Sequence, residues 1–132
     1  MSTTQASTKE TSLKLDGHTL TIEDVENVAQ RTTPVQLSEQ AMEQLRNSRK
    51  VVEDFLERRE VVYGITTGFG KFKDVYIAPE ATEELQKNFL ASHSCGVGTP
   101  FKQDVVRAIT LLRANALAKG FSGIRPVVVE LL

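Results

Sequence analysis

Apolar residues return every three or four positions in three long stretches of the chain, which predicts three amphipathic helices. The first stretch runs from Glu39 to Arg59, directly after Ser38, a residue type that favours the N-cap position. The second runs from Glu80 to His93. The third runs from Lys102 to Lys119 and ends at Gly120, a typical residue just beyond a helix C-terminus. The apolar positions that indicate the third helix are Val105, Val106, Ile109, Leu112 and Leu117.

Alternating apolar and polar residues near the N-terminus predict short strands. Leu13 and Leu15 alternate with polar residues, and Leu20 and Ile22 resume the alternation. Asp16-Gly17 lies between the two runs and is a turn dipeptide, so the pattern predicts a β-hairpin with a type I′ turn. The expected fold class is therefore mainly α with one small N-terminal β-hairpin.

Shorter elements fill the gaps between these stretches. A short helix is expected from about Ile22 to Gln30, because acidic residues follow Thr21 and suit a first helical turn. A last helix is expected to start after Arg125-Pro126. The segment Glu60 to Gly70 is rich in β-forming residues and ends with three glycines, which indicates a strand or extended segment running into a glycine loop.

Composition places the chain among ordinary globular domains and excludes some partners. Its 132 residues are 40% hydrophobic and 25% charged. With 16 basic and 17 acidic side chains the formal net charge is −1, which gives no basic field for nucleic acid or for a membrane surface. Residues 1–12 are polar and rich in Ser and Thr, so we expect a disordered tail ahead of a domain over residues 13–132. No apolar run is long enough for a membrane span, and the lone Cys95 fits a reducing cytosol.

The chain stops on an apolar run that ends at Leu132. Such a face needs a partner. It fits either a terminal helix docked on its own core or further polypeptide after Leu132, and we expect the latter.

Two segments could carry chemistry. Tyr63 stands just before the glycine loop, where nearby positive charge or hydrogen bonds to a phenolate would suit it to proton abstraction; a half-buried core tyrosine is the structural alternative. The loop itself matches neither the dinucleotide fingerprint nor the P-loop.

His93 can donate or accept a proton near neutral pH, although it also suits a plain helix C-terminus. A nucleophilic pair with Cys95 and a zinc site are both disfavoured, since i and i+2 residues do not face each other and few ligands are available.

Several separated blocks resemble the histidine and phenylalanine ammonia-lyase family. Val62-Tyr63-Gly64-Ile65-Thr66-Thr67-Gly68-Phe69-Gly70 is similar to the family's Tyr-Gly-x-x-Thr/Ser-Gly-Phe-Gly signature. Leu85-Gln86-x-Asn88 and the following Ser92-His93-Ser94-x-Gly96-x-Gly98 resemble the family's Leu-Gln-x-Asn-Leu helix and its substrate-selecting dipeptide. Arg113-Ala114-Asn115 and Gly120 to Arg125 resemble its next blocks. The resemblance runs in register from about Leu13 to Leu132 and implies the N-terminal domain of the fumarase/aspartase-like superfamily.

The resemblance also implies an activity and a set of site residues. Members eliminate ammonia from an aromatic amino acid with a 4-methylidene-imidazol-5-one group (MIO), made autocatalytically from Ala-Ser-Gly, while a tyrosine removes a β-proton. Tyr63 matches that tyrosine. The expected substrate-binding residues are Phe69, Gly70, Asn88, Ser92 and His93. Ser92-His93 matches the selectivity dipeptide and resembles that of histidine ammonia-lyases, which make urocanate, and also that of bacterial tyrosine aminomutases.

One departure from the family pattern is large. No Ala-Ser-Gly occurs in the chain, so the MIO group is expected from residues downstream of Leu132 and none of it from this segment. The resemblance further implies a cytoplasmic homotetramer for the complete enzyme and an inactive isolated segment. Two alternatives to a histidine lyase stay open: a tyrosine 2,3-aminomutase or tyrosine ammonia-lyase, and a non-catalytic helical interaction domain.

Overall fold

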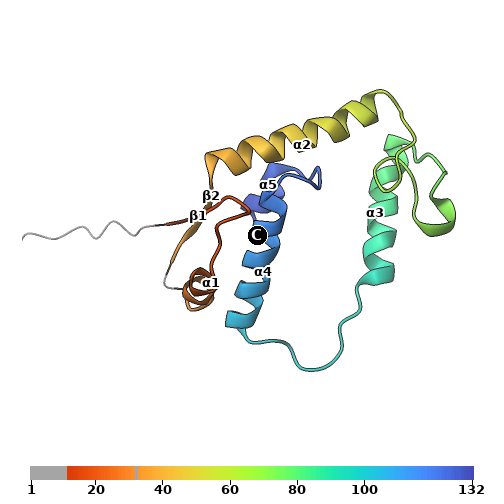
Figure 1. Ribbon diagram of the computed structural model, residues 1–132. Coiled ribbons are helices and arrows are strands. Elements are labelled where there is room, and N and C mark those ends of the chain that lie inside the picture. The colour runs from red at the N-terminus through yellow and green to blue at the C-terminus, as the bar shows by residue number, and fades with distance from the viewer. Residues whose placement is uncertain (1–11, 32) are drawn as a thin grey trace, which may run out of the picture. The chain divides into compact units, whose positions relative to one another are not determined.

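The computed structural model describes residues 12–31 and 33–132 (Figure 1). Apart from Ser12, the predicted N-terminal tail lies outside the described residues. The chain divides into two compact units, one made of Met1–Ser48 with Phe101–Leu132 and the other of Arg49–Pro100. In the described part of the chain no helix is long and apolar enough to cross a membrane.

The first unit is mainly helical, as predicted. Its elements are β1 (Leu13–Leu15), α1 (Ile22–Ala29), β2 (Val35–Leu37), the first half of α2 (Glu39–Glu57), α4 (Gln103–Ala118) and α5 (Pro126–Glu130). The predicted helices are thus confirmed to within about two residues at each end. Local capping explains two of the starts. The Thr21 side chain accepts a hydrogen bond from the Asp24 amide in a capping box, and Ser38 Oγ accepts one from the Ala41 amide at 3.1 Å.

The core of the first unit covers one face of α4. The buried side chains of α4 are Leu111, Ala114, Leu117 and Ala118, whereas Val105, Val106, Ile109 and Leu112 remain partly exposed. Of the five apolar positions named from the sequence, only Leu117 is buried. The helix is apolar on two faces, so its own pattern does not determine which face the rest of the unit covers.

The predicted β-hairpin is wrong. β1 pairs with β2 in a parallel two-stranded sheet, with Leu13 opposite Val35. The Asp16 carboxylate instead closes a side-chain turn, accepting hydrogen bonds from the His18 and Thr19 amides at 2.7 and 2.9 Å. This turn directs the chain into α1, and β1 finds its partner only after that helix.

Gly17 sits at a close approach between this turn and α4. Its φ is +88°, and an added Cβ would lie 2.6 Å from Lys119 Cγ and 3.0 Å from the Lys119 amide. Its own amide donates a hydrogen bond to Asn115 Oδ1 at 3.1 Å. Asn115 therefore has a structural function in this unit, because its side chain holds the Asp16-Gly17 turn against α4.

The Asp16 turn should make stability depend on pH in the acid range. The amide of His18, followed by that of Thr19, lowers the pKa of Asp16 from 3.8 to about 2. Because the folded-state pKa is the lower one, the stabilisation is present above pH 4 and is lost as the pH falls towards 2. We expect the difference in unfolding free energy between the wild type and Asp16→Asn to shrink over that range. An NMR titration of the Asp16 carboxyl that gives an ordinary pKa would contradict this.

Leu45 is the largest fully buried side chain of the core, with 1% of its surface exposed. Truncation to alanine removes its contacts and leaves a cavity, so Leu45→Ala should lower the free energy of unfolding by about 2–5 kcal/mol. Urea-induced unfolding followed by circular dichroism measures the change. Leu56→Ala is a matched control on the same helix, since Leu56 is 37% exposed and should lose much less. Equal losses in the two variants would show that Leu45 is not a core residue.

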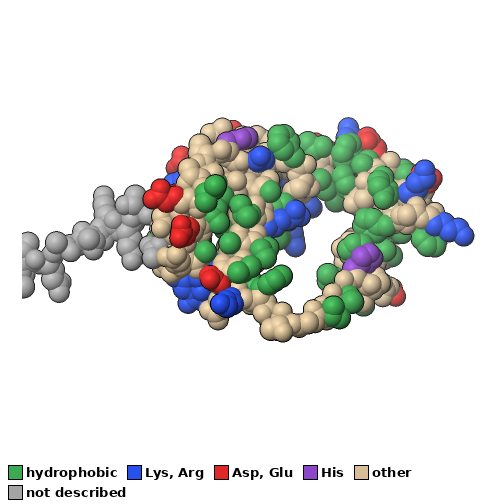
Figure 2. Space-filling view, turned by 60° about the horizontal axis from the view of Figure 1, so that its bottom comes forward, with side chains coloured by type: hydrophobic (Ala, Val, Ile, Leu, Met, Phe, Trp, Pro, Cys, Tyr) green, Lys and Arg blue, Asp and Glu red, His purple; other side chains and the backbone are tan. Residues whose placement is uncertain are grey.

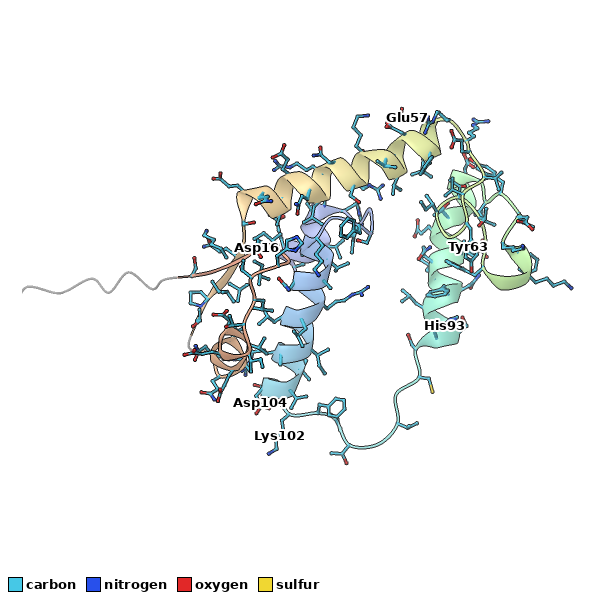
Figure 3. All side chains as sticks on the ribbon, in the orientation of Figure 1. Asp16, Glu57, Tyr63, His93, Lys102 and Asp104 are labelled. Carbon is cyan, nitrogen blue, oxygen red and sulfur yellow. The ribbon has the colours of Figure 1, made fainter. Side chains whose placement is uncertain are left out.

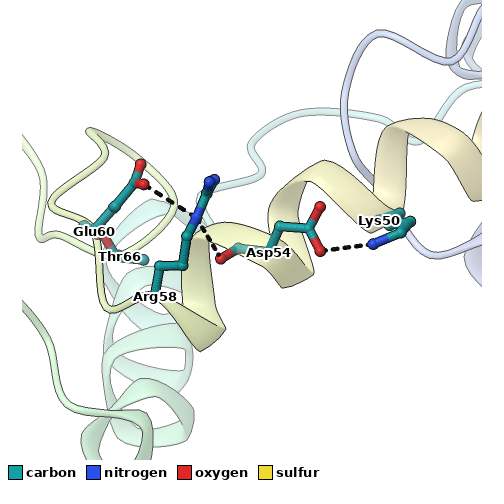
Figure 4. A network of polar contacts seen from close by, with 5 residues as sticks. All are labelled: Lys50, Asp54, Arg58, Glu60 and Thr66. Atoms are coloured by element: carbon teal, nitrogen blue, oxygen red, sulfur yellow. Dashed lines mark hydrogen bonds and ion pairs between the residues drawn. The ribbon is translucent and has the colours of Figure 1, made fainter.

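The second unit contains the end of α2, a loop region with the short 3₁₀ helix η1 (Gly70–Phe72), and α3 (Pro79–His93). Polar contacts connect the end of α2 with the loop (Figure 4). Lys50 and Asp54 form an ion pair at 2.8 Å, and Arg58 Nε lies 3.2 Å from the Asp54 carbonyl and 3.1 Å from the Glu60 carboxylate. The Thr66 hydroxyl in turn contacts the Glu60 carbonyl. Exposed pairs of this kind stabilise only weakly, so their main effect is to fix the path of the chain after α2.

Candidate functional site

Tyr63 lies in a tight turn of the second unit. The Val62 carbonyl accepts hydrogen bonds from the amides of Ile65 and Thr66 at 3.1 and 3.0 Å, and Gly64 has a φ of +75°. Of the two alternatives predicted for residues 60–70, a strand or an extended segment, the strand is wrong, because these local bonds close a turn and the β-pairing of this segment is limited to an isolated bridge of Thr67 with Tyr76. Tyr63 is 65% exposed, so the alternative of a half-buried core tyrosine is also wrong. Its side chain projects from the loop region beside α3 (Figure 3).

Two buried threonines hold this turn. Thr66 and Thr67 are each 3% exposed. The Thr66 hydroxyl accepts a hydrogen bond from the Val62 amide at 2.8 Å, and the Thr67 hydroxyl accepts one from the Gly64 amide at 3.3 Å. The two amides flank Tyr63 in the sequence, so a threonine hydroxyl anchors the backbone on each side of the phenol.

The glycine loop after Thr67 is closely packed at one position and open at another. A Cβ on Gly68 would lie 2.7 Å from Phe72 Cβ and 3.2 Å from the Phe72 carbonyl oxygen, so a larger residue does not fit there. Gly70 begins η1 with a φ of +56° and has no atom within 4 Å of the position of a Cβ. Glycine is therefore favoured at position 70 by its positive φ and not by close packing, and the space beside its backbone is open.

Ser92 and His93 form the last turn of α3. His93 Nδ1 lies 2.9 Å from Ser92 Oγ and 3.0 Å from the Phe89 carbonyl oxygen, and Ser92 Oγ also donates to that carbonyl at 3.0 Å. Both hydrogen-bond contacts of the ring involve Nδ1; none to Nε2 is found in the part of the chain that the structure describes. Both residues are exposed, and histidine side chains reach the surface (Figure 2). The local bonds orient the imidazole through Nδ1.

An aromatic contact joins the loop to α3. The Phe89 ring stacks on His93 with centroids 4.2 Å apart, and it packs on Phe69 at 5.0 Å in a tilted arrangement. The structure thus brings the predicted residues Phe69, Ser92 and His93 together. Phe89 was not among the predicted site residues; its i, i+4 spacing from His93 is the signal that could have identified it.

The remaining predicted residues lie outside this cluster. Asn88 is exposed on α3, and Tyr63 and Gly70 lie on the loop before and after the threonines. Among residues 12–31 and 33–132 there is no group of three or more His, Cys, Asp or Glu side chains that could hold a metal ion. Cys95 is exposed and is not part of a disulfide.

A cavity of about 590 Å³ lies in the first unit, and its lining includes Leu37, Arg107 and Val129. None of the predicted site residues lines it. The candidate site is therefore the surface formed by the Tyr63 turn, the glycine loop and the end of α3 in the second unit.

Comparisons with known proteins agree on one family. A family model described as aromatic amino acid lyase matches residues 20–132. A histidine ammonia-lyase of Caldanaerobacter subterraneus subsp. tengcongensis is 59% identical over 118 residues, which are 89% of this chain and 23% of that relative. The crystal structure of a histidine ammonia-lyase from Trypanosoma cruzi has a TM-score of 0.82 at 35% identity, over 91% of this chain and 23% of that one. A tyrosine aminomutase from Streptomyces globisporus has a TM-score of 0.81 at 38% identity, with the same coverage. The chain thus spans about a quarter of the length of the proteins it matches.

Proposed function

The chain belongs to the aromatic amino acid lyase family, and from this membership we propose that residues 13–132 are the N-terminal part of an ammonia-lyase that converts histidine to urocanate and ammonia. Its mainly helical fold is that of the aromatic ammonia-lyases and aminomutases. The choice of histidine is supported by the 59% identity to a histidine ammonia-lyase and by the Ser92-His93 pair at the end of α3.

Tyr63 is the proposed catalytic base. A β-C–H bond is a weak acid, so its proton must be taken by a strong base held at a fixed position. The hydrogen-bonded flanks of the turn hold the exposed phenol at a fixed position, and this placement of Tyr63 is the observation that carries the proposal. The phenolate oxygen receives the β-proton as ammonia leaves from the neighbouring carbon.

His93 is the proposed ring-selecting residue. With Nδ1 held by Ser92 and the Phe89 carbonyl, Nε2 can exchange a hydrogen bond with a substrate imidazole. A ring without such a group would leave a polar partner unpaired, which penalises phenylalanine. Phe69, Gly70 and Asn88 are proposed to contact the substrate from the loop and from α3.

The residues present do not by themselves build the family's prosthetic group. Since the chain contains no Ala-Ser-Gly, MIO does not fit within residues 1–132, and we propose that other polypeptide supplies it in the complete enzyme. The contribution of this segment is limited to the base, the ring contacts and the glycine loop. The complete enzyme is proposed to be a cytoplasmic homotetramer, and the single cysteine agrees with a reducing compartment.

A second function is favoured by one specific observation. The tyrosine aminomutase from Streptomyces globisporus shares the fold at 38% identity, slightly above the 35% of the Trypanosoma cruzi histidine enzyme. A Ser-His pair can hydrogen-bond a phenol as well as an imidazole. A tyrosine 2,3-aminomutase or tyrosine ammonia-lyase is therefore the alternative to test.

A chimeric enzyme tests the proposal. Residues of this chain replace the matching 118-residue segment of the Caldanaerobacter relative, and products from histidine and tyrosine are identified by mass spectrometry. Urocanate from histidine is the expected product. A β-amino acid or coumarate from tyrosine would favour the alternative, and a folded but inactive chimera would favour a non-catalytic interaction domain. Residues 1–132 alone should show no turnover, and turnover by them would overturn the proposal that this is an incomplete part.

A further inference from the structure

We infer that Thr66 and Thr67 are positioning residues for Tyr63: their buried hydroxyls fix the turn that aims the phenol. The inference rests on the proposed role of Tyr63 as the base. It adds two uncharged residues whose hydroxyls bond to the backbone around Tyr63.

The hydrogen bonds of the two hydroxyls bracket Tyr63. Thr66 Oγ1 accepts from the amide one residue before the tyrosine, and Thr67 Oγ1 accepts from the amide one residue after it. Each hydroxyl also donates its single proton, Thr66 to the Glu60 carbonyl at 2.5 Å and Thr67 to the Gly68 carbonyl at 3.0 Å. Each of the two threonine hydroxyls thus donates one hydrogen bond and accepts one, and all four partners are backbone groups of the same loop.

The threonines are themselves fixed by a second segment. The Thr66 carbonyl accepts a hydrogen bond from the Ile77 amide at 2.9 Å, and the Gly68 amide donates to the Val75 carbonyl at 3.2 Å. Thr67 forms an isolated antiparallel bridge with Tyr76 between these two bonds. The two threonines therefore connect residues 75–77 to the Tyr63 turn through hydrogen bonds.

Burial makes these bonds hard to replace. At 3% exposure, the hydroxyls are not readily exchanged for water, so deleting one leaves a loop amide without its partner or forces the turn to rearrange. The phenol is exposed and gains little fixation from packing of its own ring. Its position depends on the backbone of the turn, and proton abstraction is sensitive to displacements of about 1 Å.

Thr66→Val and Thr67→Val in the chimeric enzyme test the inference, because valine keeps the shape of threonine and removes only the hydroxyl. We expect kcat for histidine to fall by about 10- to 100-fold with KM changed less than about 3-fold, as for groups that act in the transition state. Thr66→Ser and Thr67→Ser keep the hydroxyl and should restore kcat to within about 3-fold of wild type. Thr82→Val is the matched control, since Thr82 lies on the exposed surface of α3 with its hydroxyl on the Ala78 carbonyl.

The serine variants separate positioning from packing. If serine lowers kcat as much as valine, the methyl group rather than the hydroxyl matters and the inference is overturned. Unchanged kcat in both valine variants overturns it as well. Hydrogen exchange of the peptide that spans residues 60–70, measured by mass spectrometry, should be faster in the valine variants. Unchanged exchange in this peptide would contradict the proposed anchoring. This measurement does not depend on enzyme activity.

Tyr63→Phe in the same chimera separates this inference from the proposed function. If Tyr63→Phe abolishes turnover while the valine variants retain it, only the role of the threonines is wrong. If Tyr63→Phe retains turnover, the proposed base is wrong, and the positioning role fails with it.

Discussion

Tyr63→Phe should lower the kcat of the chimeric enzyme for histidine by about 100- to 10,000-fold, the usual contribution of a general base. The substitution removes one oxygen atom and keeps the ring. Because Tyr63 is 65% exposed, the free energy of unfolding should change by less than about 0.5 kcal/mol. Steady-state kinetics and thermal unfolding measure the two quantities on the same preparation.

The chain offers a matched control for this substitution. Tyr76 is the second of the two tyrosines of the chain, and it lies opposite Thr67 in the isolated bridge. Tyr76→Phe also removes a single phenolic oxygen. We expect near wild-type turnover in that variant. Equal activities of Tyr63→Phe and Tyr76→Phe would remove Tyr63 from the mechanism, and a large loss in both would indicate that the loop, rather than one phenol, is sensitive.

His93→Phe should have the second largest effect, on substrate choice. It removes the imidazole that stacks on Phe89 and replaces it with a ring that can still stack but cannot form hydrogen bonds. The kcat/KM for histidine should fall by about 10-fold or more, and that for phenylalanine should rise, because an unpaired polar group no longer opposes its ring. Competition assays with both amino acids report the ratio directly.

The other histidine supplies the control for selectivity. His18 lies in the first unit and is exposed, so His18→Phe should leave the ratio of histidine to phenylalanine turnover unchanged. An unchanged ratio in His93→Phe as well would refute its role in the pocket. A fall in activity on both substrates without a change in their ratio would make His93 a structural residue of the α3 C-terminus.

Much of this protein could be predicted from short-range sequence pattern. Helix positions follow from apolar spacing and from capping residues such as Thr21 and Ser38, because both the hydrogen bonds of a helix and its caps join residues at most four positions apart. The signature around Tyr63 and the pair Ser92-His93 also lie in continuous segments. Family membership can therefore be predicted from the sequence alone.

Tertiary structure decided the features that depend on distant residues. The strand β1 pairs with β2 rather than with the adjacent residues, because the Asp16 carboxylate closes a turn that no alternation pattern reveals. The contact of Phe69 with Phe89 joins residues twenty positions apart. Periodicity shows that a segment has an apolar face, but it does not say which segment will cover it. On α4 two apolar faces were available, and the packed core buried the one with Leu111 and left the one with Ile109 partly exposed.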